Sequence, residues 1–139
     1  MEKYFKRAYR MVTKDEYYDD FLTAIGMNKF CRFLAKKSIT ITEVNKLNED
    51  EYELKLITTF ATKSQIFSPG QVKEIQYIDG RRFKNIFEFD ENRLIEKQVE
   101  KNREVTIIRE FHENEMLGTI IVGDIKTKQK SIFEAFIQL

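Results

Sequence analysis

With 139 residues the chain has enough material for one hydrophobic core, and we expect a single domain over residues 1–139. Its net charge of +1 favours no phosphate-binding surface, so nucleic acid is not an expected partner. A polar N-terminus, a single cysteine (Cys31) and the lack of a long apolar run indicate a soluble, cytoplasmic protein.

The first expected elements are a strand and a helical segment. Residues Tyr4–Val12 alternate loosely and predict a strand. Thr13-Lys14-Asp15-Glu16 has the form of a capping box, which predicts a helix start there, within a helical stretch of about residues 14–37. Gly26 interrupts this stretch, and Asn28 is predicted to cap a second short helix. The residues expected to point inward from that helix are Phe30, Phe33 and Leu34.

From about residue 38 onward, short alternating strands are separated by turn signals roughly every eleven residues. The signals lie at residues 48–50, 79–80, 90–92, 100–102, 112–114 and 123–124. This spacing predicts an antiparallel meander that closes into a barrel or sandwich. A closed barrel of about ten strands can enclose a ligand, and a helical lid would cover its mouth.

Arg109 is the residue most indicative of chemistry. It shares one face of its predicted strand with Val105, Ile107 and Phe111. A guanidinium stays charged, so on an inward face it needs a carboxylate, ordered water or an anionic ligand. Alternation alone leaves open whether this face points outward, or whether Arg109 pairs with an internal Glu or Asp.

Other signatures of chemistry are weak, and we expect no catalytic residues, no metal and no cofactor. His112 is the single histidine and lies in a predicted turn, while Cys31 has no histidine motif near it. No nucleophile elbow, P-loop or dinucleotide fingerprint occurs. The second helix ends in basic residues that form either a solvated face or a transient contact with anionic membranes: Lys29, Arg32, Lys36 and Lys37.

Several motifs follow one another in a fixed order over nearly the whole chain. They are Phe5-x-x-x-Tyr9-Arg10-Met11-Val12, Tyr18-Asp19-Asp20-Phe21-Leu22 with Ile25-Gly26, Thr59-Phe60 with Phe67 and Gly70-Gln71, Asp79-Gly80-Arg81-Arg82-Phe83-Lys84, and Thr106-Ile107-Ile108-Arg109-Glu110. In this order and spacing they resemble the intracellular lipid-binding proteins, the family of fatty-acid-binding and cellular retinoid-binding proteins. Tyr9 stands where this family usually has tryptophan.

The resemblance implies an all-β fold: a ten-stranded antiparallel up-and-down β-barrel, or β-clam, capped by a short helix-turn-helix over a large cavity. Members carry fatty acids, retinoids or bile acids through the cytosol. By position, Arg109 would hold the ligand carboxylate and Phe60 would sit at the portal. The remaining wall and portal positions implied are Tyr18, Leu22, Ile25 and Met27 on the lid side, and Ile78, Asp79 and Arg81 opposite them.

The last strand departs from the family pattern. Fatty-acid binders commonly end in an Arg-x-Tyr pair that grips the carboxylate, whereas residues 128–133 contain no arginine. A gapless match places Gln129 and Ser131 at those positions, and a two-residue insertion places Ser131 and Phe133 there. The insertion is favoured because residues 132–134 resemble the family's strand ending. Loss of the second cation should weaken head-group capture, or favour a neutral or bulkier ligand.

The expected function is therefore non-enzymatic binding and cytosolic transport of a long-chain fatty acid, or a similar hydrophobic anion, by a monomer. One alternative is a carrier of retinoids or other bulky lipids, favoured if Gln129 faces the cavity. Another is an interaction module whose barrel is filled by its own side chains, since the chain has twelve phenylalanines.

Overall fold

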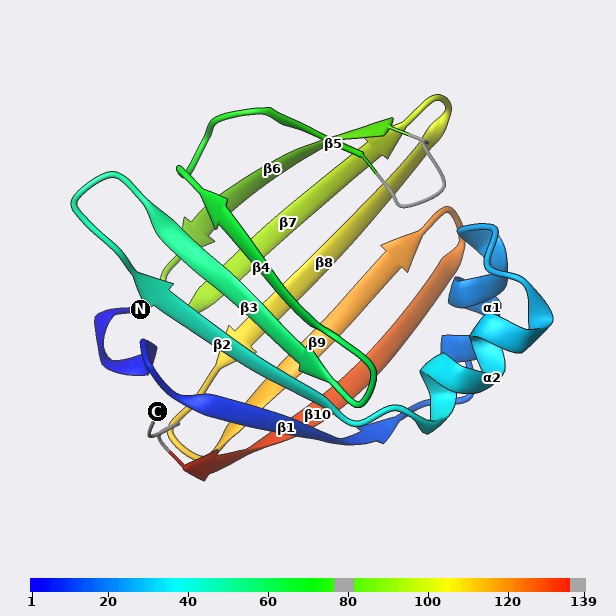
Figure 1. Cartoon of the computed structure of the whole chain (residues 1–139), viewed down its shortest axis with the longest axis horizontal. Helices are drawn as coiled ribbons and strands as arrows, with labels where there is room; N and C mark the ends of the chain where they lie inside the picture. Colours follow the sequence, from blue (N-terminus) through cyan, green and yellow to red (C-terminus); the bar gives the residue numbers. More distant parts are fainter. Residues whose placement is uncertain (77–81, 136–139) are drawn as a thin grey trace.

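The computed structural model describes residues 1–76 and 82–135, which form ten strands, two short helices and a 3-10 turn (Figure 1). The helices are α1 (Tyr18–Ala24) and α2 (Lys29–Lys37), and the 3-10 turn is Glu2–Tyr4. The strands are β1 (Ala8–Lys14), β2 (Thr40–Lys46), β3 (Tyr52–Thr58), β4 (Thr62–Phe67), β5 (Lys73–Gln76), β6 (Arg82–Asp90), β7 (Arg93–Glu100), β8 (Arg103–Phe111), β9 (Glu115–Val122) and β10 (Ile125–Ala135). No helix in the described ranges is long and apolar enough to cross a membrane.

The strands form one antiparallel sheet in the order β4-β3-β2-β1-β10-β9-β8-β7-β6-β5. Each strand pairs with its neighbour in sequence except β4 and β5, and the β1–β10 pairing joins the first and last strands. The sheet curls into a nearly closed barrel, with β4 and β5 at the two ends of the order and both helices gathered at one end (Figure 1). The predicted ten-stranded up-and-down barrel with a helix-turn-helix cap is confirmed.

The predicted turns join the strands wherever the structure describes them. Residues 91–92, 101–102 and 123–124 connect β6–β7, β7–β8 and β9–β10. Gly123 has φ +55°, a left-handed conformation that glycine adopts without steric cost. The turn predicted at Asp79-Gly80 lies outside the described residues.

Two expectations near the N-terminus were wrong. The first strand begins at Ala8 rather than Tyr4, because residues 2–4 form a 3-10 turn that buries the Tyr4 ring. The capping box does not start a helix, since β1 continues to Lys14 and α1 begins at Tyr18. Asp15 explains the difference: its carboxylate accepts hydrogen bonds from the backbone N–H groups of Tyr17 (3.0 Å) and Lys128 (2.8 Å). These bonds hold the segment against β10 instead of capping a helix.

The helix-turn-helix follows the predicted glycine turn. Gly26 has φ +86°, and the N–H of Met27 reaches back to the Leu22 carbonyl at 3.1 Å, which closes the end of α1. The Asn28 side chain accepts from Cys31 N–H at 2.8 Å, so the predicted cap of α2 is confirmed.

The inward orientation expected for Phe30 and Phe33 was wrong, because their residues are 68% and 51% exposed. Phe30 and Phe33 lie on the outer side of α2. Of the three residues, Leu34 alone faces the barrel interior.

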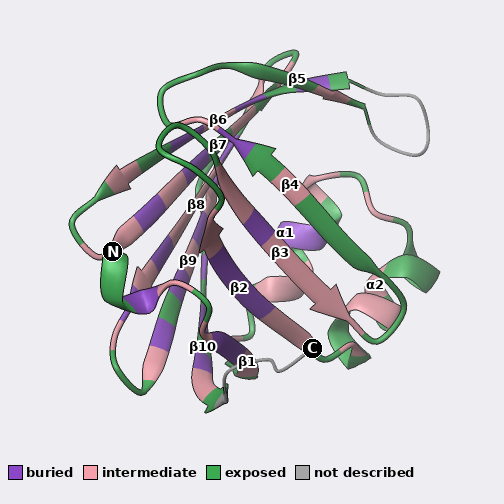
Figure 2. Cartoon of the chain, turned by 60° about the vertical axis from the view of Figure 1, so that its left-hand side comes forward, coloured by how far each residue is buried: buried purple, intermediate pink, exposed green. Residues whose placement is uncertain are grey.

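The core divides into two clusters at the two ends of the barrel interior (Figure 2). The aromatic cluster contains Tyr4, Tyr9, Val44, Leu54, Phe67, Phe87, Leu94, Phe111 and Met116. Its closest ring pair is Phe67–Phe87, with centroids 4.3 Å apart. The lid cluster contains Phe21, Leu22, Val105, Ile120 and Val122 and attaches α1 to β8 and β9. Nine of the eighteen phenylalanine and tyrosine residues thus belong to the aromatic cluster or pack against it, at one end of the barrel.

Candidate functional site

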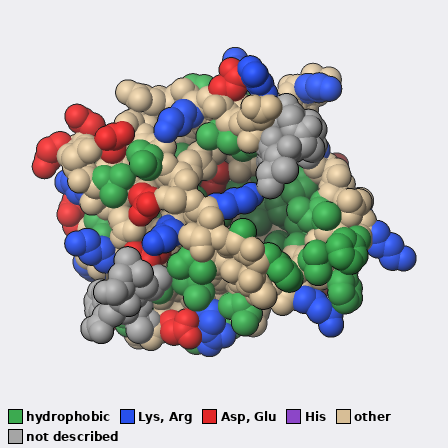
Figure 3. All heavy atoms as spheres, in the orientation of Figure 1, with side chains coloured by type: hydrophobic (Ala, Val, Ile, Leu, Met, Phe, Trp, Pro, Cys, Tyr) green, Lys and Arg blue, Asp and Glu red, His purple; other side chains and the backbone are tan. Residues whose placement is uncertain are grey.

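A cavity of about 530 Å³ lies between the two clusters and beneath the helices. Met116 of the aromatic cluster and Ile120 of the lid cluster both line it, which places it between them. Figure 3 shows the surface hollowed here, with hydrophobic side chains around the opening. The volume lies within the usual range of about 300–1,000 Å³ for small-ligand sites. A barrel filled by its own side chains, the alternative considered above, does not fit this interior.

Most of the cavity wall is apolar. Its hydrophobic side chains come from β1, α2, β3, β8 and β9 and include Met11, Leu34, Leu56, Ile107, Met116 and Ile120. Methionine side chains adapt to irregular shapes, so this wall can adjust to a flexible alkyl chain. The portal, the rim formed by α2 and the β3–β4 turn, carries Phe60, whose residue is 63% exposed.

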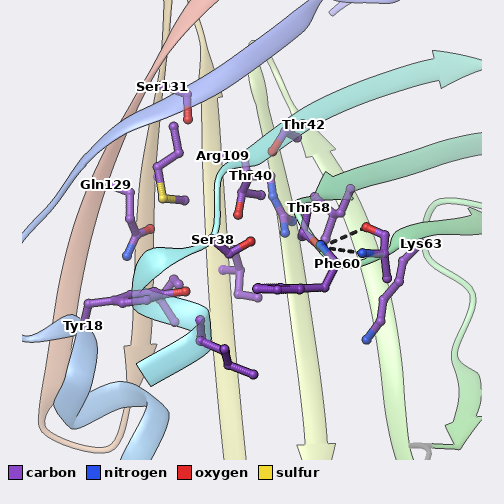
Figure 4. A pocket seen from close by; sticks show the side chains of 18 of the residues that line it. Tyr18, Ser38, Thr40, Thr42, Thr58, Phe60, Lys63, Arg109, Gln129 and Ser131 are labelled. Atoms are coloured by element: carbon purple, nitrogen blue, oxygen red, sulfur yellow. Dashed lines mark hydrogen bonds between the residues drawn. The ribbon is translucent and has the colours of Figure 1, made fainter. Parts of the chain in front are cut away.

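The polar part of the wall centres on Arg109. This residue lies on β8 with Ile107 and faces the cavity (Figure 4). Its Nη1 donates to Glu96 Oε1 at 2.8 Å. The side chains of Arg109 and Glu96 are 9% and 4% exposed. Of the two alternatives that the sequence left open, the outward-facing one was wrong, because Arg109 faces the cavity, and the other is observed, because Arg109 pairs with an internal glutamate.

Glu96 is held as an acceptor on both oxygens. Its Oε2 accepts hydrogen bonds from Gln98 Nε2 at 2.7 Å and from Asn85 Nδ2 at 3.1 Å, while its Oε1 accepts one from Arg109. Buried charge is tolerated only when it is paired and hydrogen-bonded in this way. Sequence reasoning missed Glu96, although Leu94, Glu96 and Gln98 share the inner face of β7, and Leu94 pairs directly with Arg109. That parity is the signal that could have found it.

Comparisons with known proteins agree with this architecture. A fatty acid-binding protein of Tyrophagus putrescentiae is 31% identical over 114 residues, which cover 81% of this chain and 85% of that protein. This chain belongs to the fatty-acid-binding protein family. Among solved structures, a fatty acid-binding protein from brain tissue of Drosophila melanogaster has a TM-score of 0.85 and 26% identity, covering 93% of this chain and 98% of that one.

The fold is shared more widely than the sequence. A Schistosoma mansoni fatty acid binding protein, solved in complex with arachidonic acid, superimposes with a TM-score of 0.87 at 20% identity, over 97% of this chain and 98% of that one. No family-wide sequence profile matches the chain.

In this member of the family, the last strand presents Gln129 and Ser131 to the cavity (Figure 4). These are the positions of the gapless match. Phe133, which the favoured insertion placed on the cavity wall, packs instead against Tyr9 with ring centroids 6.1 Å apart. Ser131 and Phe133 point to the same side of β10. Ser131 lines the cavity, whereas Phe133, which lies farther from the helices, packs against the aromatic cluster.

Gln129 and Arg109 lie on opposite sides of the same glycine, Gly118. Arg109 and Gln129 each pair with Gly118 on β9, one from β8 and one from β10. A Cβ atom at Gly118 would meet Gln129 Oε1 at 3.0 Å, so the glutamine side chain folds over the glycine. The missing side chain leaves open the space between the guanidinium and the amide.

A short relay connects Gln129 to the start of the lid. Gln129 Nε2 donates to Thr127 Oγ1 at 3.4 Å, and Thr127 Oγ1 donates to Asp15 Oδ1 at 2.5 Å. Slight burial opposes ionisation of Asp15, but the hydrogen bonds from Thr127 and from the backbone of Lys128 and Tyr17 together lower its pKa. Asp15 therefore accepts hydrogen bonds as a carboxylate and fastens the β1–α1 segment to β10.

The remaining sequence candidates fall into three groups. Tyr18, Met27 and Phe60 line the cavity, and burial raises the pKa of the Tyr18 phenol. Leu22 is buried in the lid cluster and Ile25 packs against that cluster, so these two support the lid instead of the cavity wall. The implied positions Ile78, Asp79 and Arg81 lie outside the described residues.

Proposed function

We propose that this chain binds a long-chain fatty acid or a similar amphipathic lipid inside the barrel and carries it through the cytosol without catalysing a reaction. The observation that carries this proposal is a cavity of about 530 Å³ whose wall is largely apolar and includes Arg109. Family membership and the name of the Tyrophagus relative support the same ligand class.

The energetics favour a ligand held mainly by its tail. At about 0.8 kcal/mol per buried methylene, a chain of about sixteen carbons contributes roughly 12 kcal/mol before costs. Association entropy and ordering of the chain remove a large share, which leaves an affinity near micromolar or better. The head group then decides orientation and selectivity more than total affinity.

For the bound pose, we infer that the head lies near Arg109, Gln129 and Ser131 and that the tail runs along the apolar wall toward the helices. Tyr18 and Phe60 flank the path by which the tail enters, because both line the cavity and Phe60 is exposed at the portal. This assignment of roles is supported by position on the wall.

For the cellular setting, we propose a single-domain monomer whose lid makes transient contact with membranes. Support comes from α2, where the exposed rings of Phe30 and Phe33 lie on the same short helix as Lys36 and Lys37. Exposed aromatic rings beside basic residues suit an anionic bilayer surface.

A chain-length series tests the proposal. Fatty acids of eight, twelve and sixteen carbons would compete with Nile red, and affinity should rise steeply with length, by up to about fourfold per methylene. Leu56→Trp places an indole in the cavity and should weaken sixteen-carbon binding about tenfold or more. Leu117→Trp on the outer face of β9 is the matched control and should change nothing. Length-independent binding, or equal effects of the two variants, would contradict the proposal.

A second candidate, a carrier of retinoids or bulkier lipids, has support in one observation. Gln129 lies on the cavity wall, where its amide can hydrogen-bond a hydroxyl group. Titration with retinol, followed by its absorption band, tests this reading, and saturation at one equivalent is the expected result.

A further inference from the structure

We propose that the head-group site selects lipids with an uncharged head that both donates and accepts hydrogen bonds, such as a hydroxyl or primary amide, and that Glu96 sets this preference. The inference rests on the proposed function, because it concerns the head of a lipid whose tail occupies the cavity.

The first step is the charge of the site. Arg109 is one of two cations on the described cavity wall, and its charge is balanced by Glu96 at 2.8 Å. Lys63, the other cation on the wall, belongs to β4 near the portal. A ligand carboxylate placed beside Arg109 would therefore meet a fixed anion a few ångströms behind it. When a lipid tail fills the cavity, little water remains to screen that repulsion, which offsets much of the attraction from the guanidinium.

Glu96 is also unable to move aside. Its side chain is 4% exposed, and its two oxygens receive hydrogen bonds from three different side chains on β6, β7 and β8. Leaving Arg109 would strand a buried carboxylate, which is costly. Arg109 consequently stays paired and offers a ligand only its remaining N–H donors.

The second step is the orientation of Gln129. Asp15 accepts the hydroxyl proton of Thr127, so Thr127 Oγ1 can only accept from Gln129. The amide nitrogen of Gln129 is thereby directed toward Thr127, and its Oε1 lies over Gly118, the residue that pairs with Arg109 on β8. The Asp15–Thr127–Gln129 hydrogen bonds thus fix Gln129 Oε1 as an acceptor at the head-group site.

The two steps together define a pattern of donors and acceptors. Arg109 supplies donors from one side of Gly118, and Gln129 Oε1 supplies an acceptor from the other. A hydroxyl or primary amide can accept from the first and donate to the second. A carboxylate has acceptors alone, so it would place an acceptor against Gln129 Oε1 with no proton to share between them. The site is therefore complementary to an uncharged head.

The test compares two ligands that share a tail. Palmitoleic acid and palmitoleyl alcohol would be titrated at pH 7.5 against wild type, Glu96→Gln and Glu104→Gln by Nile red displacement, with calorimetry for direct affinities. Glu104 is exposed on the same strand as Arg109, so Glu104→Gln removes the same charge away from the cavity. Thermal melts would establish that each variant is folded.

We expect the wild type to bind the alcohol at least as tightly as the acid. Glu96→Gln should strengthen acid binding by roughly tenfold or more, because it removes the opposing charge, and leave the alcohol within about twofold. Glu104→Gln should change neither. Tighter binding of the acid by wild type, or an unchanged acid affinity in folded Glu96→Gln, overturns the inference while the proposed function stands. Failure of both ligands to displace Nile red overturns the proposed function and the inference with it. If Glu96→Gln does not fold, the wild-type comparison decides alone.

Discussion

Removing either partner of the Arg109–Glu96 pair should destabilise the barrel, but removing Arg109 should cost more than neutralising Glu96. Arg109→Ala leaves a carboxylate that is 4% exposed and keeps only two amide donors, which we expect to cost about 3 kcal/mol. Glu96→Gln should cost about 1–2 kcal/mol, because Arg109 faces the cavity and can be solvated there. In the Glu96→Gln variant, the Asn85 amide can also rotate so that its Oδ1 accepts from the new amide nitrogen. This oxygen has no hydrogen-bond partner among the described residues.

The double variant Arg109→Ala/Glu96→Gln should lose about 2 kcal/mol, well below the sum of about 4–5 kcal/mol for the single variants, because neither charge is then left buried alone. We expect a coupling free energy of about 2–3 kcal/mol between the two positions. For a chain of 139 residues, about 1 kcal/mol corresponds to roughly 3–4 °C in Tm, so Arg109→Ala should melt about 10 °C lower than wild type.

Urea unfolding of the wild type, both single variants and the double variant measures this coupling. The Arg93–Asp90 pair, at 2.8 Å with side chains 41% and 52% exposed, is the control and should couple by less than about 1 kcal/mol. A coupling at Arg109–Glu96 no larger than at the control pair would refute the reasoning that Glu96 is a buried, fixed anion.

Three further outcomes follow from the structure. Asp15→Asn should loosen the attachment of the lid to β10. Because the pKa of Asp15 is lowered on folding, its contribution is fully present above its ordinary value of 3.8 and lost as pH falls further, so wild type and variant should converge below about pH 3.8 in acid-unfolding curves. A constant difference would contradict this. Phe67→Ala removes the ring stacked on Phe87 and should cost about 3–5 kcal/mol in urea unfolding, and a loss below 1 kcal/mol would contradict the packing described. Gly118→Val should displace Gln129 and fill the space beside it, lowering lipid affinity about tenfold by Nile red competition; unchanged affinity would show that this space is not used.

Several local signals in the sequence were informative. Strand alternation, the regular turns and the Asn28 cap each depend on residues a few positions apart, and the structure agrees with them. The helix start predicted from the capping box was wrong because of a contact distant in sequence. The Asp15 carboxylate accepts a hydrogen bond from the backbone N–H of Lys128 on β10, which no local pattern encodes. The inward orientation predicted for Phe30 and Phe33 was wrong for a related reason. The helical period groups residues on one face of the helix, but it does not say whether that face turns toward the barrel or toward solvent.

The head-group site was only half predictable. Strand parity and family resemblance pointed to Arg109, and the gapless family match named Gln129 and Ser131, although the insertion that names Ser131 and Phe133 was favoured. Glu96 was missed because a glutamate on a strand is ordinarily solvated, and its burial becomes visible only once β6, β7 and β8 lie side by side. The charge balance of the cavity, and with it the expected head group, therefore required the structure.

Native mass spectrometry is the most direct test of whether the cavity holds a lipid tail. Protein purified without organic solvent should carry a mass increment equal to one long-chain lipid, and stripped protein should regain one equivalent when incubated with palmitoleic acid or palmitoleyl alcohol. Detection of the bare chain alone, before and after incubation with excess of either lipid, would contradict the account.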